Sequence, residues 1–220
     1  MGIRIGDIDI KKPIVQSGVD INDYYNLTKK SSGGINKYIK QIPMIDTSDY
    51  TSMNRLFDGC NSLTTIPQLD TSNVTNMNGM FASCNSLTTI PQLNTSNVTN
   101  MNSMFYICLA LTTIPQLDTS KVTNISNIFY MCDPLTNLGG FTNLGQAYST
   151  TQSANYSYYK LDLSPCQNLT HDSLMNVINN LYDIATKGVK TQQLVLGSTN
   201  LAKLTAEEIA IATNKGWVVS

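Results

Sequence analysis

An internal repeat of 24 residues constrains this chain more than any other feature of its sequence. Phenylalanine, cysteine, leucine and proline each recur at that spacing, in register, between residues 42 and 138. A unit of this length is too small to bury its own apolar face, so successive units must stack and share one core. The recurring positions are Phe57, Phe81, Phe105 and Phe129; Cys60, Cys84, Cys108 and Cys132; Leu63, Leu87, Leu111 and Leu135; and Pro67, Pro91 and Pro115.

One segment of each unit has the spacing of a short helix. In the second unit four apolar residues fall at positions i, i+3, i+4 and i+7, which places them on one face of a helical turn. Thr75 precedes the segment and is its expected N-cap. The four apolar residues are Met77, Met80, Phe81 and Cys84.

The next segment is typical of a short strand. Residues 87–90 read Leu-Thr-Thr-Ile, and Pro91 follows them. Because proline has no N–H to donate, we expect it to end the strand. Each unit therefore contributes a strand and a helical turn, and stacking predicts an α/β repeat solenoid with short strands and short helices.

The repeated segment Thr-Ser-Asn-Val-Thr-Asn-Met-x-x-Met-Phe-x-x-Cys-x-x-Leu resembles the BspA-like leucine-rich repeats over residues 42–138. That family occurs in surface proteins of gut and oral bacteria and in phages of such bacteria. The resemblance implies a solenoid of leucine-rich-repeat type that serves for binding or structure. It implies no enzymatic activity for the repeat itself.

Residues 141–220 depart from the strict period and favour longer units that contain helices. Thr170 is the expected N-cap of a helix that closes at Gly188, and Thr205 with Glu208 has the spacing of a capping box. We interpret this region as helix-bearing repeats that cap the exposed end of the solenoid. Its predicted strands are residues 161–164, 193–196 and 217–219.

Residues 1–40 favour a β-hairpin followed by a linker. Ile3–Ile5 and Ile8–Ile10 alternate on either side of a two-residue Gly-Asp turn. A lone hairpin is marginal in water, so we expect its apolar face to dock on a partner as an assembly anchor, freed by the Ser/Gly-rich linker at residues 29–34. The anchor residues are Ile3, Ile5, Ile8 and Ile10. The expected regions are 1–40 (hairpin anchor and linker), 41–140 (solenoid) and 141–220 (longer repeats and cap).

The residues that carry most enzyme chemistry favour structural roles here. No Cys-x-x-Cys pair of the kind that zinc sites use is present, so we expect the repeated cysteines to pack in the core and leave Cys166 open to exposure. The single histidine, His171, has no evident orienting carboxylate. The repeated Asp46, Asp70 and Asp118 favour turn capping over glycoside hydrolysis. The sequence predicts no catalytic residue, no metal, no cofactor and no enzyme.

The strand face is the best candidate for a ligand or partner surface. In a solenoid, equivalent side chains of neighbouring strands lie about 4.8 Å apart, and here they form an uncharged row of hydrogen-bonding groups. The expected row is Thr65, Thr89 and Thr113, backed by Gln68, Gln92 and Gln116. A merely solvated β-face is the alternative.

Charge and hydropathy narrow the function further. Only 13% of the residues are charged and the net charge is -1, which disfavours a nucleic-acid ligand because such binders need a basic surface. No apolar run of about 18 residues is present, so we expect no membrane insertion. The alternating amino terminus is unlike a signal peptide.

The leading hypothesis is therefore a non-enzymatic structural or attachment protein, a tail, fibre or capsid-decoration component of a phage virion that uses its solenoid for protein or glycan contacts. The alternative is a bacterial cell-surface adhesin that lacks its leader. The expected partners are other virion or surface proteins and a host glycan or protein, and a homo-oligomer is compatible with both.

Overall fold

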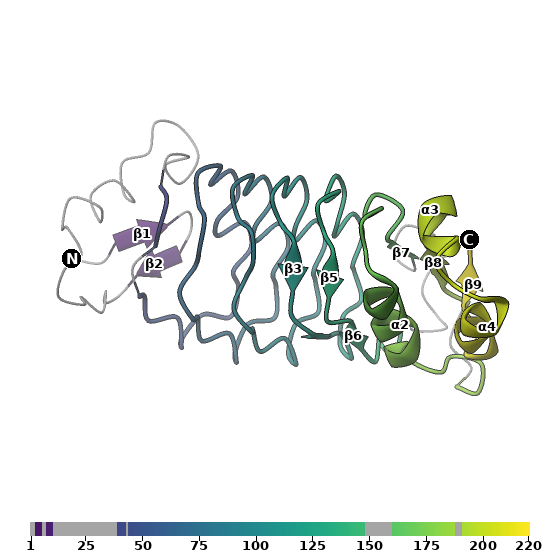
Figure 1. The fold of residues 1–220 in the computed structure, drawn as a ribbon. Helices are drawn as coiled ribbons and strands as arrows, with labels where there is room; N and C mark the ends of the chain where they lie inside the picture. Colours follow the sequence, from purple (N-terminus) through teal and green to yellow (C-terminus); the bar gives the residue numbers. More distant parts are fainter. Residues whose placement is uncertain (1–2, 6–7, 11–38, 43, 148–159, 188–190) are drawn as a thin grey trace.

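A row of stacked coils forms most of the molecule in the computed structural model (Figure 1). The structure describes residues 3–5, 8–10, 39–42, 44–147, 160–187 and 191–220. Each coil runs parallel to the next, and we number coils 1 to 4 by Phe57, Phe81, Phe105 and Phe129. The carboxyl terminus lies at the end of the row that carries the helices.

Two parallel rows of backbone pairs join the coils. The first is the strand row, which includes β3 (Thr113–Ile114) paired with β5 (Asn137–Leu138). It continues through isolated bridges from Gln41 to Thr65 and from Thr89 to Thr113. The second row bridges Ser52, Asn76, Asn100 and Asn124 in turn. Beside these rows, β4 (Leu117–Asp118) pairs with β6 (Phe141–Thr142).

The helical turn predicted for each unit is wrong, because no residue described between 39 and 147 is helical. Instead, some backbone N–H groups of the segment bond to the next coil and others bond within the segment. Met77 N donates to Asn100 O and Phe81 N donates to Met104 O, both in the next coil. Met80 N donates to Met77 O in its own coil. The i, i+3, i+4 spacing therefore marks a chain of turns whose alternate N–H groups bind the neighbouring coil.

Left-handed residues keep these turns from merging into a helix. Gly79 and Ser83 have φ of 59° and 58°, and equivalent residues in the other coils share the conformation. A residue with positive φ every four positions breaks a right-handed run. Thr75, the expected N-cap, donates its N–H and its hydroxyl to Thr51 O of the preceding coil.

A single column of aromatic rings runs through the core. Phe57, Phe81, Phe105 and Phe129 are fully buried, and their successive ring centroids lie 5.5, 5.7 and 5.8 Å apart with nearly parallel planes. Offset stacking of this kind is a favoured arrangement of aromatic pairs. The phenylalanine repeat in the sequence is therefore a continuous stack in space.

The cysteines form a second buried column. All five are free thiols with negligible exposure, Cys166 included, so the exposure left open for Cys166 is wrong. Cys84 Sγ donates to Phe57 O at 3.1 Å, and Cys108 and Cys132 repeat the contact with the preceding coil. The expectation of core packing is confirmed for the repeated thiols.

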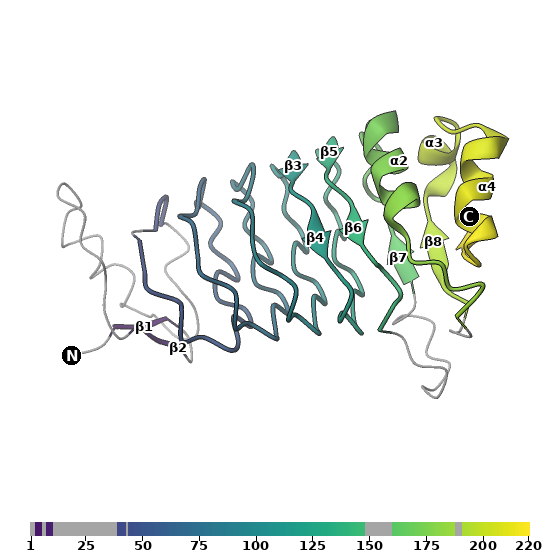
Figure 2. The same cartoon turned by 90° about the horizontal axis from the view of Figure 1, so that it is seen from below.

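The carboxyl-terminal region ends the row with a three-stranded parallel sheet, β7 (Lys160–Asp162), β8 (Gln193–Val195) and β9 (Val218–Val219). Figure 2 shows its helices at the same end of the molecule, with α2 beside β5. They are α2 (His171–Asn180), α3 (Gly197–Leu201) and α4 (Ala206–Asn214).

Most of the sequence predictions for this region are confirmed. Thr170 caps α2 by accepting from Ser173 N, and Thr205 with Glu208 forms the capping box of α4. Helix α2 ends well before Gly188, because Leu181 leaves the helix in an extended conformation to bridge Leu144 of the coil row. The five-residue helix α3 was not predicted.

The antiparallel pairing predicted near the amino terminus is present between β1 (Ile3–Ile5) and β2 (Ile8–Ile10), with Ile3 opposite Ile10 and Ile5 opposite Ile8. The side chains of this pair, which the anchor hypothesis needs, and the linker predicted at residues 29–34 lie outside what the structure describes.

The aromatic column supports a stability prediction. Phe81→Ala should lower the free energy of unfolding by about 3–5 kcal/mol, because the ring is shared by coils 1 to 3 and its loss leaves a cavity. Urea denaturation followed by circular dichroism measures the change. Phe81→Leu, which retains most of the volume, is the control and should lose clearly less. Equal midpoints for wild type and Phe81→Ala would contradict the assigned core.

The buried thiols support a reactivity prediction. Burial raises the pKa of Cys60 and of Cys132 to about 12 and raises that of Cys84 still further. Since the thiolate is the reactive form, an aromatic disulfide reagent should label native protein slowly and urea-unfolded protein at all five cysteines. Fast stoichiometric labelling of the native chain would contradict this burial.

Candidate binding surface

The Thr-Thr pairs of the strand row place their two hydroxyls in different surroundings. The first threonine binds the preceding coil: Thr64 Oγ1 donates to Lys40 O at 3.1 Å, and Thr112 Oγ1 donates to Thr88 O at 3.2 Å. Among the residues that the structure describes, the hydroxyl of the second threonine makes no bond to another coil. At Thr89, for example, Oγ1 makes only a long contact of 3.5 Å with Ile90 O. The row of second threonines is therefore a set of available donors and acceptors.

The structure brings the predicted threonines together in one ladder. Thr65 and Thr89 are exposed, and Thr113 is half-buried. Thr89 and Thr113 pair directly across adjacent coils. Asn137 extends the same register by one coil through its pairing with Thr113. The 24-residue spacing from Thr113 was the signal that could have identified Asn137.

The glutamines are largely occupied by the structure itself. Gln68 Nε2 donates to Gln92 O at 2.8 Å and to Leu69 O at 3.3 Å, and Gln92 Nε2 makes the same pair of contacts one coil further on. Their side-chain oxygens remain as acceptors. Gln116 is exposed, and Gly140 stands at its position in the next coil. The predicted backing row thus mainly joins coils.

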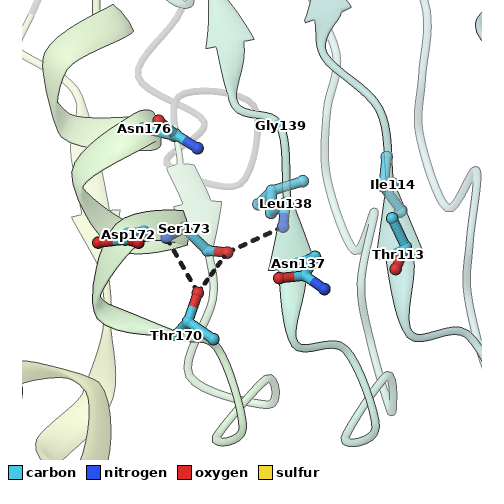
Figure 3. A pocket seen from close by; sticks show the side chains of 9 residues that line it. All are labelled: Thr113, Ile114, Asn137, Leu138, Gly139, Thr170, Asp172, Ser173 and Asn176. Carbon is cyan, nitrogen blue, oxygen red and sulfur yellow. Dashed lines mark hydrogen bonds between the residues drawn. The ribbon is translucent and has the colours of Figure 1, made fainter.

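The ladder ends at an open groove of about 330 Å³ against helix α2 (Figure 3). Its lining includes Thr113 and Asn137 from the strand row and Asp172 and Asn176 from α2. Figure 3 shows Asn176 reaching from the helix toward β5. The α2 residues were not predicted for this surface, because their approach to the ladder depends on how the helix docks.

Two hydroxyls fix that docking. Ser173 Oγ donates to Thr136 O at 3.0 Å and accepts from Leu138 N at 3.1 Å. One side chain of α2 therefore provides hydrogen-bond partners for two backbone groups of the last coil. Thr170 Oγ1 lies 2.9 Å from Ser173 Oγ and accepts from Ser173 N. These bonds hold α2 against the last coil, and Thr113, Asn137 and Asn176 are among the residues that line the groove between them.

The acidic residues of the repeat cap turns, as predicted. Asp70 Oδ1 accepts from Ser72 N at 3.0 Å and from Ser72 Oγ at 2.7 Å, and these bonds lower the pKa of the Asp70 carboxyl. Asn94 makes the same two contacts with Ser96. Among the residues that the structure describes, no three His, Cys, Asp or Glu side chains gather in a group that could hold a metal ion.

His171 does have a carboxylate partner, which corrects the sequence analysis. Its Nε2 lies 2.9 Å from Glu208 Oε1, and its Nδ1 lies 3.5 Å from Asp172 Oδ1. The hydrogen bond with Glu208 is the main cause of a raised pKa for His171. The contact joins α2 to α4, 37 residues apart in the chain, so only the packing of the two helices could reveal it.

The stacked coils define a repeat protein whose strand face carries an uncharged ladder of threonines. Residues 25–162 match a family described as "Mycoplasma protein of unknown function, DUF285". Because this match covers more than half of the chain, the protein belongs to the DUF285 family. Comparisons with curated proteins and with solved structures found no match. Within the described ranges, every helix is too short or too polar to cross a bilayer.

The His171–Glu208 contact supports a pH prediction. A raised folded-state pKa means that this contact stabilises the fold below the ordinary histidine value near 6.5 and that the stabilisation is lost as pH rises through the raised pKa. Since the chain has one histidine, its NMR titration is unambiguous. Glu208→Gln should lower the measured pKa while its amide oxygen keeps the capping box.

Glu207→Gln is the matched control, because Glu207 lies in the same first turn of α4 and makes no contact with His171. It should leave the His171 titration where it is in the wild type. Indistinguishable titrations for Glu208→Gln and wild type would show that Glu208 does not hold the imidazolium.

Proposed function

We propose that this chain is a non-enzymatic structural or attachment protein whose coil stack is an α/β solenoid of the BspA-like leucine-rich-repeat type. Support for the fold comes from parallel pairing at the repeat spacing and from the DUF285 match, which covers the repeats. On this proposal the coils are a scaffold, and the protein works through the surface that the scaffold repeats.

The observation that carries the function is the ladder of Thr65, Thr89 and Thr113. Equivalent hydroxyls lie in register on adjacent coils, are exposed or half-exposed, and are left over when the inter-coil hydrogen bonds have been made. A row of uncharged donors and acceptors suits the hydroxyls of a glycan or the backbone of a protein. The groove at Asn137 extends this contact surface toward α2.

We assign this contact role first to a phage virion, as a tail, fibre or capsid-decoration protein. The two-stranded β1–β2 pair supports an anchoring role, because a pair of three-residue strands needs a further surface to be stable. The alternative is a bacterial cell-surface adhesin. It is favoured by the family description, which names a bacterium, Mycoplasma.

Immunogold labelling with an antibody raised against the coil stack separates the two locations. Label on phage particles supports the virion assignment, and label on intact bacterial cells supports the adhesin. Label confined to the cytoplasm of sectioned cells would contradict both.

The contact surface is tested by a triple variant of the ladder. Replacing Thr65, Thr89 and Thr113 with alanine should reduce binding of the fluorescently labelled protein to the surface of its host bacterium by about tenfold, the equivalent of one or two hydrogen bonds. Flow cytometry measures the binding.

The matched control places three alanines on exposed hydroxyl residues away from the ladder, at Thr191, Ser198 and Thr199. Both triple variants should retain the thermal midpoint of the wild type within a few degrees. If both bind the host as well as the wild type does, the ladder is a solvated β-face and the assignment of the contact surface fails.

A further inference from the structure

A hollow on the turn segments of coils 1 to 3 interrupts the regular pattern of side chains there. Gly79 and Ala82 of coil 2 are among its lining residues, whereas the coils on either side carry longer side chains at one of the same positions. The cavity has a volume of about 320 Å³. The residues that occupy the Ala82 position along the row are Asp58, Ala82, Tyr106 and Tyr130.

One wall of the hollow is an aromatic face. Tyr106 and Tyr130 are stacked with ring centroids 4.9 Å apart and planes inclined by 10°. Because coil 4 covers one face of Tyr106, its other face is turned toward coil 2, where the methyl group of Ala82 is too short to cover it. Tyr106 accordingly lines the cavity.

The opposite wall carries two charges that are loosely paired. Arg55 Nη1 lies 3.7 Å from Asp58 Oδ2, which is longer than a hydrogen bond. Burial raises the pKa of the Asp58 carboxyl even with Arg55 beside it. The carboxylate is therefore partly desolvated without a strong partner, and the guanidinium has N–H donors to spare.

Side-chain amides complete the lining. Asn78 and Asn102 border the cavity from adjacent coils. Asn102 Oδ1 accepts from Ser103 Oγ at 2.9 Å, and an amide group can both donate and accept, so the site combines hydrogen-bonding groups with one apolar, π-rich surface. Since Arg55 and Asp58 balance each other in charge, this combination suits a neutral ligand with many hydroxyls and one flat C–H face.

We propose that this hollow, the Arg55–Tyr106 slot, binds one pyranose ring of a neutral glycan. The C–H face of the sugar packs on Tyr106, whose ring face carries partial negative charge. The ring hydroxyls bond to Asp58, Arg55 and the bordering asparagines. The volume lies at the small end of the ~300–1,000 Å³ range of ligand sites, which fits a single sugar ring. The slot lies on a different segment of the coil from the threonine ladder and does not depend on its function.

Saturation-transfer NMR on the full-length protein tests the slot with methyl β-glucoside, methyl β-galactoside and the methyl glycoside of N-acetylglucosamine as probes. We expect transfer to the ring C–H protons of at least one of them. The Tyr106 ring signal, assigned from its loss in Tyr106→Ala, should shift during the same titration.

Three variants locate the site. Ala82→Tyr continues the tyrosine row into coil 2 and should abolish binding by filling the slot. Tyr106→Ala should weaken binding by about tenfold or more, whereas Tyr106→Phe keeps the ring and should bind as the wild type does. Ser198→Ala, at an exposed hydroxyl residue of α3 away from the slot and the ladder, is the control and should leave binding unchanged.

Asp58→Asn removes only charge and should weaken binding without affecting the fold, so the test stands even if Ala82→Tyr is poorly folded. The proposal is overturned if none of the three glycosides receives saturation, or if Tyr106→Ala and Asp58→Asn bind a glycoside as tightly as the wild type. Binding that the Thr65, Thr89 and Thr113 variant removes instead would assign the sugar to the ladder.

Discussion

Backbone hydrogen bonds between equivalent residues of adjacent coils are the interaction on which the rest of this structure depends. Thr75 N donates to Thr51 O and Thr99 N to Thr75 O, both at 2.8 Å, and the pattern recurs on the strand row. Such bonds hold the coils in exact register, so every side chain lies beside its own counterpart 24 residues away. The side chain at each repeat position must therefore be compatible with a similar side chain next to it.

This constraint explains the unusual chemistry of the chain. Uncharged side chains can repeat along a row without penalty: each glutamine amide donates to the backbone carbonyl of its counterpart in the next coil, and the phenylalanine rings stack. Identical charges repel at that distance. The row of aspartates shows this repulsion. The negative charge of Asp46 acts to raise the pKa of Asp70, although the hydrogen bonds from Ser72 lower it overall. In the next coil, Asn94 stands in place of a third successive carboxylate. The low charged fraction of 13% fits this repulsion between equivalent positions.

The two candidate contact surfaces arise in different ways from the same regularity. The threonine ladder is the repeat itself, because Thr65, Thr89 and Thr113 recur at the repeat spacing while the hydroxyls of Thr64 and Thr112 bind the preceding coil. The Arg55–Tyr106 slot and the groove at α2 are interruptions of the repeat. A small residue stands among large ones at Ala82, and a helix replaces the next coil beside Asn137. Uniform rows thus supply extended contacts, whereas breaks in the rows supply concave ones.

The sequence by itself determined the period, the aromatic and thiol columns, the aspartate turns and the caps at Thr170 and Thr205. Each of these follows from residue type and spacing along the chain, and the structure confirms them. Only the tertiary structure decided that the Met-Phe segment is a series of turns with a left-handed residue at every fourth position. Its spacing fits a helix equally well, and the choice depends on whether its N–H groups bond within the segment or to the next coil.

The same distinction applies to the sites. Thr65, Thr89 and Thr113 could be placed on one face from the period alone, and Asn137 could have been added in the same way. The docking of α2 on the last coil, the His171–Glu208 contact and the uncovered face of Tyr106 could not. They depend on distances between segments that no local pattern encodes, because packing sets those distances only after the coils have stacked.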